Sequence, residues 1–221
     1  MLKVKKLTKT FQSGDGRVTA LNEVSFNIDE GRFVSVIGKS GSGKTTLLSI
    51  LGTLEKPTSG TITVDNRELT GLTAKEMVAY RCKQIGFVFQ GYNLVPNLTA
   101  LENVMLPMEF AGVPAKQRIM RAKELLDQVG LVGDKIQRKP GRLSGGEQQR
   151  IAIARALANQ PKFILADEPT GNLDSETGKK IFDLLHDLSK SQNTTVIVVT
   201  HDLSIAGKTD QTFKLEDGKL L

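Results

Sequence analysis

The stretch GKSGSGKT at residues 38–45 decides the fold of this 221-residue chain. It follows the apolar run FVSVI at residues 33–37 and precedes a helix-like run that starts at Thr46. The pattern G-x-x-x-x-G-K-[ST] between a strand and a helix is typical of a loop that binds phosphates. Its glycines let successive backbone N–H groups turn inward, and the dipole of the following helix favours negative charge. The stretch therefore predicts an α/β fold with a triphosphate-binding loop.

Two side chains of this loop have separate expected roles. The Lys44 ammonium would reach the β- and γ-phosphates of a nucleotide, and the Thr45 hydroxyl would bind Mg²⁺. The residues expected to contact the nucleotide are Gly38, Lys39, Ser40, Gly41, Ser42, Gly43, Lys44, Thr45 and Thr46. A glycine-rich turn with a lysine present by chance is the alternative, and the strand and helix that flank the loop argue against it.

A second glycine-marked helix start has the sequence LSGGEQQR at residues 143–150, and it opens a helical run over residues 151–158. Glycine permits the close approach of a phosphate, and a helix N-terminus favours its negative charge. Because the chain already has a complete triphosphate-binding loop, we expect it to share its nucleotide with another copy through this second feature.

Two acidic residues, Asp167 and Glu168, end the apolar run FILA at residues 163–166. Buried parallel strands read as continuous apolar stretches, and ligands bind at their carboxyl ends. Asp167 is therefore expected to bind Mg²⁺, directly or through water, and Glu168 to polarise an attacking water as a general base. Two acids that begin a solvated loop would give the same pattern, but the phosphate loop favours the catalytic interpretation. A third apolar strand, residues 195–199, leads to His201 at the same kind of strand end.

These motifs, in this order, resemble the ATP-binding subunit of an ABC transporter, and the resemblance extends over essentially the whole chain. Residues 38–45 resemble the Walker A loop of that family, residues 163–167 resemble Walker B, and residues 143–147 resemble its signature. The resemblance implies that the chain binds ATP and Mg²⁺ and hydrolyses ATP. The catalytic residues that it implies are Glu168, the Q-loop glutamine Gln90 and the switch histidine His201.

The resemblance also assigns the remaining contacts of the site. Phe11 stands where the family places an aromatic ring on adenine, and Phe keeps the stacking face of the commoner Tyr without its hydroxyl. Residues 172–174 resemble the D-loop. The implied Mg²⁺ ligands are Thr45, Gln90 and Asp167. The implied contacts from the opposite chain are Ser144, Gly145, Gly146 and Glu147.

Residues 87–90, 93–96, 98–104 and 165–174 resemble, in particular, the lipoprotein-release and macrolide-exporter type of ABC transporter. In that type, two ATPase chains drive two separately encoded permeases that carry a large extracytoplasmic domain. The resemblance implies a head-to-tail dimer with ATP between the copies, an integral membrane permease as partner, and efflux or extraction of a substrate. An ATP-dependent regulatory module that signals to a membrane partner, as in cell-division control, stays open as the alternative.

Two other classes of ATPase fit the sequence less well. Chromosome-organising and DNA-repair ATPases carry a long coiled coil between the phosphate loop and the signature, whereas that interval is short and broken by prolines here. Translation-associated ATPases of this superfamily carry two cassettes in one chain.

Composition favours a cytoplasmic protein without a nucleic-acid partner. The net charge is +6, but the basic residues are scattered, and an aromatic content of 5% leaves little to stack on bases. No apolar run approaches the roughly 20 residues that span a bilayer. The single cysteine, Cys82, fits a reducing cytosol. We therefore expect a peripheral protein at the cytoplasmic face of the cell membrane.

We expect one ABC-type ATPase domain over residues 1–221, with a P-loop NTPase core built on a mostly parallel sheet. Residues 1–30 alternate apolar and polar side chains around Gly14-Asp15-Gly16, which predicts an N-terminal antiparallel β subdomain with a turn. A further turn is expected at residues 57–60, followed by a short strand at residues 61–64.

A helical subdomain is expected over residues 92–142. Breaks in its helices are expected at Pro96, Pro107, Pro114 and Pro140-Gly141. Near its start, Tyr92, Val95 and Leu98 lie in a loop-like stretch around Pro96, where we expect the permease to dock. The residues expected in the core of the subdomain are Leu101, Val104 and Met105.

Overall fold

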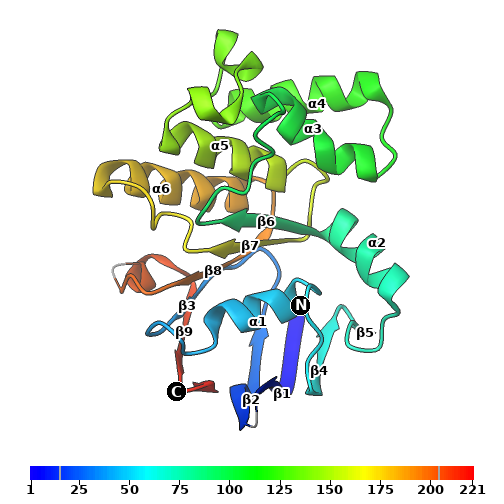
Figure 1. Ribbon diagram of the computed structural model, residues 1–221, viewed down its shortest axis with the longest axis vertical. Coiled ribbons are helices and arrows are strands. Elements are labelled where there is room, and N and C mark those ends of the chain that lie inside the picture. The colour runs from blue at the N-terminus through cyan, green and yellow to red at the C-terminus, as the bar shows by residue number, and fades with distance from the viewer. Residues whose placement is uncertain (15, 204) are drawn as a thin grey trace. The chain divides into compact units, whose positions relative to one another are not determined.

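The computed structural model describes residues 1–14, 16–203 and 205–221 of the chain (Figure 1). The chain divides into two compact units. The first unit contains Met1–Arg81 and Thr195–Leu221, and the second contains Cys82–Thr194. Helix α2 (Ala74–Gln84) carries the chain from the first unit into the second.

An antiparallel sheet in the first unit is built mainly by the N-terminal residues. Its strands, in order across the sheet, are β2 (Gly16–Ile28), β1 (Leu2–Ser13), β4 (Ser59–Val64) and β5 (Arg67–Glu68). Leu2 and Val4 are buried whereas Lys3 and Lys5 are exposed, which is the alternation of a strand with one face in the core. The predicted antiparallel subdomain is thus confirmed, although Asp15 of the expected turn lies outside the described residues.

The turn predicted for residues 57–60 is too long, because β4 already begins at Ser59. Ser59 pairs with Thr8 beyond a register shift in β1. Gly60 has a φ of 88°, and a Cβ on it would lie 2.3 Å from the carbonyl oxygen of Lys6. Glycine is required there because it lets β4 run close against β1, where a side chain would clash.

The first unit also holds parallel strands around β3 (Phe33–Ile37). This strand lies between β8 (Thr195–Thr200) and β9 (Gln211–Glu216) and runs parallel to both, while β10 (Lys219–Leu220) pairs antiparallel with β9. Every residue of β3 and β8 is buried, as predicted for strands covered on both faces. The phosphate loop joins β3 to α1 (Lys44–Leu51), which is the predicted order of strand, loop and helix.

The second unit combines a parallel pair of strands with the larger helices (Figure 1). Strand β6 (Ile85–Phe89) runs parallel to β7 (Phe163–Asp167). The helices are α3 (Ala100–Phe110), α4 (Ala115–Gln128), α5 (Gly145–Ala156) and α6 (Ser175–Ser191), with 3₁₀ turns at Gly133–Gln137 and Pro140–Arg142. Helix α5 contacts α3, α4, α6 and β6, so it forms the centre of this unit.

Strand β6 and helix α5 approach each other closely at Gly86. A Cβ on Gly86 would lie 2.2 Å from the carbonyl oxygen of Ala156, the last residue of α5. The backbones of the two elements are therefore in direct contact, and only glycine permits this packing. The contact fixes β6, which leads to Gln90, against the helix that begins at Gly145.

Pro107 lies inside α3, so the break predicted at this proline is wrong. A proline cannot donate to the carbonyl four residues earlier, here that of Asn103. The helix continues nevertheless, because the Ala111 N–H donates to the Pro107 carbonyl at 3.1 Å. Asn159 Nδ2 donates to the same carbonyl at 3.0 Å and to the Cys82 carbonyl at 2.7 Å, which ties this turn of α3 to the end of α2.

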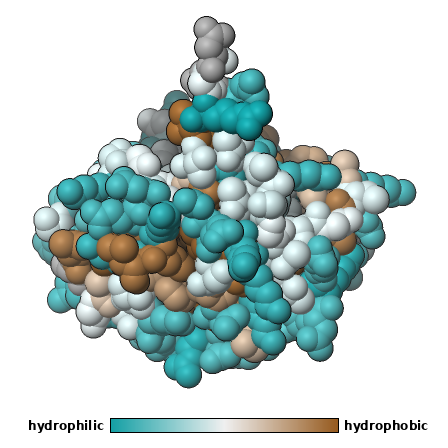
Figure 2. All heavy atoms as spheres, turned by 90° about the horizontal axis from the view of Figure 1, so that it is seen from below, coloured by the Kyte–Doolittle hydropathy of each residue, from teal (hydrophilic) through white to brown (hydrophobic). Residues whose placement is uncertain are grey.

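Within the ranges that the structure describes, no helix has both the length and the apolar character needed to cross a bilayer. Hydrophilic side chains cover most of the face seen in Figure 2, and the hydrophobic residues on that face gather mainly in one patch.

Candidate nucleotide-binding site

The phosphate loop is spanned by its own lysine. Lys44 Nζ donates to the carbonyl oxygens of Gly38 and Lys39, at 2.8 Å each, and Lys44 is only 8% exposed. Because Lys44 is also the first residue of α1, the strand-to-helix connection itself places the ammonium over the loop.

Two positions of the loop must be glycine, because neighbouring backbone atoms leave no room for a side chain. A Cβ on Gly38 would lie 2.2 Å from the carbonyl oxygen of Leu215, and one on Gly43 would lie 2.3 Å from that of Ala20. Between them, the Ser42 hydroxyl is buried and has no hydrogen-bond partner among the described residues. Buried polar groups are nearly always paired. The loop is therefore built with an unsatisfied hydroxyl that suits an oxygen-rich ligand such as a phosphate.

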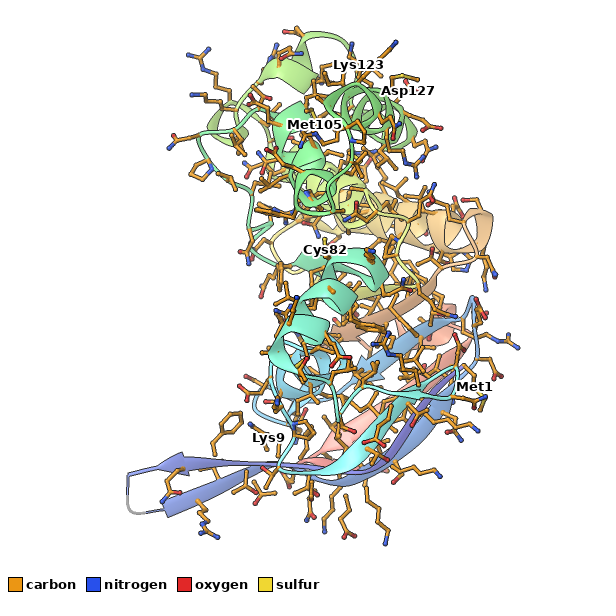
Figure 3. The ribbon with its side chains drawn as sticks, turned by 90° about the vertical axis from the view of Figure 1, so that its right-hand side faces the viewer. Met1, Lys9, Cys82, Met105, Lys123 and Asp127 are labelled. Atoms are coloured by element: carbon orange, nitrogen blue, oxygen red, sulfur yellow. The ribbon has the colours of Figure 1, made fainter. Side chains whose placement is uncertain are left out.

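Phe11 lies on β1 and is 39% exposed. Lys9 Nζ lies 4.8 Å from the ring centroid, within the range of a cation–π contact. Lys9, near the base of the β1–β2 hairpin (Figure 3), donates to Glu55 Oε1 at 2.7 Å and to the Lys56 carbonyl at 2.8 Å. The hydrogen bond from Lys9 lowers the pKa of the Glu55 carboxyl. This pair supports the ring, which remains open enough to stack on a base.

The predicted acidic pair follows the buried strand β7. Asp167 is the last residue of the strand, and Glu168 has a φ of 44°, in the left-handed region. Residues other than glycine adopt this conformation mainly in turns. The Gly171 N–H donates to the Glu168 carbonyl at 3.0 Å and closes a turn. The chain thus changes direction at the residue predicted to be the general base.

Gln90, which follows β6, is joined to Asn172 by two hydrogen bonds. Gln90 Nε2 donates to Asn172 Oδ1 at 3.1 Å, and Asn172 Nδ2 donates to the backbone carbonyl of Gln90 at 2.9 Å. Gly171 lies against this pair, since a Cβ on it would stand 2.8 Å from Gln90 Nε2. The segments that resemble the Q-loop and the D-loop are therefore bonded to each other.

The signature helix α5 begins with a capping box. The Glu147 N–H donates to Ser144 Oγ at 3.3 Å, and the Ser144 N–H donates to Glu147 Oε2 at 2.8 Å. Glu147 Oε1 also pairs with Lys135 Nζ at 2.8 Å. The pKa of the Glu147 carboxyl is lowered mainly by Lys135 and then by the Ser144 N–H. Glu147 therefore holds the helix start within its own chain, a role that the S-x-x-E spacing of Ser144 and Glu147 is able to indicate from sequence.

Arg155, to which no motif points, joins α5 to the segment after Gln90. Its guanidinium donates to the Asn93 carbonyl at 2.5 Å and to the Tyr92 carbonyl at 2.8 Å, and burial lowers its pKa. Tyr92 and Asn93 have φ values of 60° and 49°, so the arginine stabilises a turn in the left-handed region. The available signal was one arginine inside the apolar run IAIARALA, because a buried charge needs partners.

The predicted site residues are divided between the two units. The first unit carries the phosphate loop, Phe11 and His201. The second unit carries Gln90, Asp167, Glu168 and residues 144–147. Within the second unit, the structure joins the segment of Gln90 both to residues 171–172 and, through Arg155, to the signature helix.

The proposed metal ligands Thr45, Gln90 and Asp167 offer a hydroxyl, an amide oxygen and one carboxylate. Among the described residues, no cluster of three or more His, Cys, Asp or Glu forms a metal site of its own. Mg²⁺ is usually bound through one or two carboxylates together with the phosphates of a substrate. The donor set therefore fits Mg²⁺ bound with a nucleotide and does not fit a structural zinc site.

Comparison with known proteins places the chain among related sequences. A family profile described as ABC transporter matches residues 21–171. The chain is 45% identical over 221 residues to the lipoprotein-releasing system ATP-binding protein LolD of Syntrophus aciditrophicus, with 100% of this chain and 99% of that protein covered. It is also 45% identical over 221 residues to the macrolide export ATP-binding/permease protein MacB of Aggregatibacter actinomycetemcomitans, with 100% of this chain and 34% of that protein covered.

A solved structure is similar over the whole chain. It is the dimeric post-hydrolysis state of the ATP-binding cassette MJ0796, from Methanocaldococcus jannaschii, bound to ADP and Pi. The TM-score is 0.91 at 48% sequence identity, with 100% of this chain and 96% of that chain covered. The predicted fold class is confirmed by this similarity.

Proposed function

Because this chain belongs to the ABC transporter family, we propose that it is the ATP-binding and ATP-hydrolysing subunit that powers a separately encoded membrane permease. The work done would be efflux or extraction of a substrate. By their names, LolD takes part in lipoprotein release and MacB in macrolide export. These names support transport over the alternative of an ATP-dependent regulatory module.

The phosphate loop carries this proposal. Its lysine is buried and bonded across the loop, Gly38 and Gly43 are required by packing, and the Ser42 hydroxyl is buried without a partner among the described residues. Such a loop at a helix N-terminus suits a triphosphate. Phosphate release from ATP by the purified chain, measured with and without Mg²⁺, tests the activity. A folded chain that neither binds ATP nor releases phosphate would contradict the proposal.

The individual roles follow the family resemblance. Glu168 would accept a proton from the attacking water, with Gln90 and His201 completing the catalytic set. Phe11 would stack on adenine. The residues that would hold Mg²⁺ are Thr45, Gln90 and Asp167. When bound, Mg²⁺ neutralises charge on the β- and γ-phosphates, as is usual in P-loop ATPases.

The two compact units would act as one ATPase domain over residues 1–221, with residues 92–142 as its helical subdomain. The match to the ABC transporter profile supports this reading, since it covers residues 21–171 and so includes parts of both units.

Two copies of the chain would pack head to tail, with ATP between the phosphate loop of one copy and residues 144–147 of the other. The dimeric state of MJ0796 supports the pairing of two copies, and the family resemblance supplies the head-to-tail arrangement. The N-terminus of α5 would meet the γ-phosphate through the Ser144 side chain and the N–H groups of Gly145 and Gly146. The helix dipole and the glycines suit this contact.

Gly145→Asp is expected to prevent ATP-dependent dimerisation while a single copy still binds ATP. The carboxylate would face the γ-phosphate held by the opposite copy, and like charges repel. Sedimentation with ATP, in a Glu168→Gln background that prevents hydrolysis, measures the dimer.

Gly145→Ala is the matched control for this experiment. A Cβ on Gly145 would lie 2.7 Å from the Tyr92 hydroxyl, so either substitution displaces that side chain. The alanine variant crowds Tyr92 without adding charge and should retain more dimer than the aspartate variant. A Gly145→Asp dimer as stable as that of the parent would rule out the head-to-tail arrangement.

The segment between Gln90 and α3 is the docking surface that we propose for the permease, at the cytoplasmic face of the membrane. Val95 is 37% exposed, and Tyr92 and Leu98 are half-buried. The fully buried Asn103 orders this loop: its Oδ1 accepts from the Val95 N–H at 2.8 Å, and its Nδ2 donates to the Leu98 carbonyl at 3.2 Å. An ordered loop with apolar side chains at its surface suits a protein partner.

The residues after this loop lie deeper in the second unit. Leu101 and Val104 are buried in α3, as predicted for core residues, while Met105 is half-buried. The docking surface that we propose therefore excludes Leu101 and Val104, whereas Met105 belongs to the same half-buried class as Tyr92 and Leu98.

Val95→Glu and Leu98→Glu are expected to abolish co-purification with the permease and any permease-dependent change in ATP hydrolysis. ATP binding by the isolated subunit should be unchanged. A carboxylate buried in an apolar interface loses its hydration without a compensating partner. Affinity capture through a tagged permease, followed by hydrolysis assays on the captured complex, measures both effects.

Phe110→Glu provides the matched control, because Phe110 is 76% exposed at the far end of α3. It should leave the complex intact. If Leu98→Glu unfolds the soluble subunit, Leu98 belongs to the core and the exposed Val95 decides the test. An intact complex with Val95→Glu would place the docking surface elsewhere.

A further inference from the structure

The two hydrogen bonds between Gln90 and Asn172 have defined donors and acceptors, and their directions bear on how Gln90 would bind Mg²⁺. We propose that Asn172 is a positioning residue that makes Gln90 present its side-chain oxygen, and not its nitrogen, to the metal ion. The inference rests on the proposed role of Gln90 as a Mg²⁺ ligand and adds to it the group that orients this ligand.

The backbone carbonyl of Gln90 determines the direction of both hydrogen bonds, because it is able only to accept. Asn172 lies 2.9 Å from this oxygen, so the group that faces it must be the NH₂ of the asparagine. The orientation of an isolated side-chain amide is ambiguous by half a turn. Here the carbonyl removes the ambiguity for Asn172.

The orientation of Asn172 then determines that of Gln90. With its NH₂ on the carbonyl, Asn172 turns Oδ1 toward the end of the Gln90 side chain, at 3.1 Å. An amide oxygen accepts, so the facing atom of Gln90 must be the donor Nε2. The Oε1 atom of Gln90 consequently points away from Asn172. Magnesium binds oxygen ligands, and an NH₂ group turned toward it would be repelled.

The loop that carries Asn172 is held on both sides of this residue. On one side, the Gly171 N–H donates to the Glu168 carbonyl at 3.0 Å. On the other side, Asp174 caps α6 by accepting from the Thr177 N–H at 3.0 Å. Gly171 itself has no side chain, and a Cβ there would stand 2.8 Å from Gln90 Nε2. The conformation of the loop thus brings Asn172 close to Gln90 and keeps the two residues at hydrogen-bonding distance.

The test compares nucleotide affinity with Mg²⁺ and with a chelator, measured by titration of a fluorescent ATP analogue in a Glu168→Gln background. Asn172→Leu is expected to lower the affinity in Mg²⁺ by about 2-fold to 10-fold, the usual range for one net hydrogen bond. The affinity in chelator should stay unchanged. A general loss of structure would lower the nucleotide affinity both in Mg²⁺ and in chelator. Should Asn172→Leu fail to fold, Asn172→Ser, which is smaller and polar, takes its place in the same comparison.

A second substitution separates orientation from any other effect of Asn172. Gln90→Glu replaces the terminal amide by a carboxylate, which has an oxygen at both terminal positions. It therefore needs no orienting partner. In the Gln90→Glu background, Asn172→Leu should no longer weaken the affinity in Mg²⁺. Asn27→Leu, the same change at an exposed position of β2, is the control and should have no effect.

The outcomes distinguish this inference from the proposed role of Gln90. If Gln90→Ala leaves the Mg²⁺-dependent affinity unchanged, Gln90 is not a metal ligand and both ideas fail. If Gln90→Ala weakens this affinity but Asn172→Leu does not, Gln90 keeps its role and the orienting role of Asn172 is wrong. An equal effect of Asn172→Leu in the parent and in the Gln90→Glu background would also overturn the inference.

Discussion

Glu168→Gln is expected to lower the rate of ATP hydrolysis by about 10²–10⁴-fold, the usual contribution of a general base, while ATP binding stays intact. An amide does not accept the proton of the attacking water at neutral pH. The turn at this position is closed by the Gly171 N–H, which donates to the backbone carbonyl of Glu168, and the substitution keeps that carbonyl. Phosphate release at saturating ATP and titration with a fluorescent ATP analogue measure the two effects separately.

The same variant is expected to accumulate as an ATP-bound dimer, because in the proposed mechanism ATP would close the dimer and hydrolysis would reopen it. Glu176→Gln is the matched control. Glu176 is an exposed acid in the first turn of α6, paired with Lys180 at 2.6 Å, and removing its charge should leave turnover unchanged. Near-normal hydrolysis by pure Glu168→Gln protein would exclude Glu168 from the role of general base.

Lys44→Ala is expected to weaken ATP binding itself, by on the order of 10²-fold or more, since breaking a buried charge pair typically costs about 2–5 kcal/mol. Lys44 is buried, and its ammonium bonds the carbonyls of Gly38 and Lys39. The substitution removes the charge that would face the phosphates and also the bonds that span the loop. Titration with a fluorescent ATP analogue measures the loss.

Lys39→Ala provides the comparison within the same loop. Lys39 is exposed, so water screens its charge, and the same substitution there should cost much less affinity. Unchanged affinity in Lys44→Ala would mean that the loop is structural. A Glu168→Gln protein that binds without turnover, beside a Lys44→Ala protein that binds poorly, would separate the catalytic role from the binding role.

Local patterns in the sequence predicted the elements that carry the site. The strands β3, β7 and β8 read as continuous apolar runs because neighbouring elements cover both of their faces. The phosphate loop was recognisable because the freedom of glycine and the reach of Lys44 are properties of single residues. Family resemblance then supplied the roles of residues that lie far apart in the chain.

Two local predictions were wrong because distant partners override local preference. Pro107 does not end α3, since Ala111 continues the helix and Asn159, from the segment after α5, bonds the proline carbonyl. The turn before β4 is shortened because β1 offers a pairing partner to Ser59. At β4 the contact across the fold supplied the pairing partner that the short stretch of sequence lacked, and at Pro107 the Asn159 amide adds a second donor to a carbonyl that already accepts from Ala111.

Only the tertiary structure decided which loops are joined to each other by hydrogen bonds. Gln90 bonds Asn172 across 82 positions, and Arg155 bonds Asn93 across 62. These contacts depend on packing such as that of Gly86 against the Ala156 carbonyl, which arises from the backbones of two distant segments and leaves no local pattern. The sequence alone therefore determined what each loop is able to bind. The pairing of β6 with β7 and the packing of β6 against α5 decided which of those loops are fixed together, because such contacts exist only after distant segments meet.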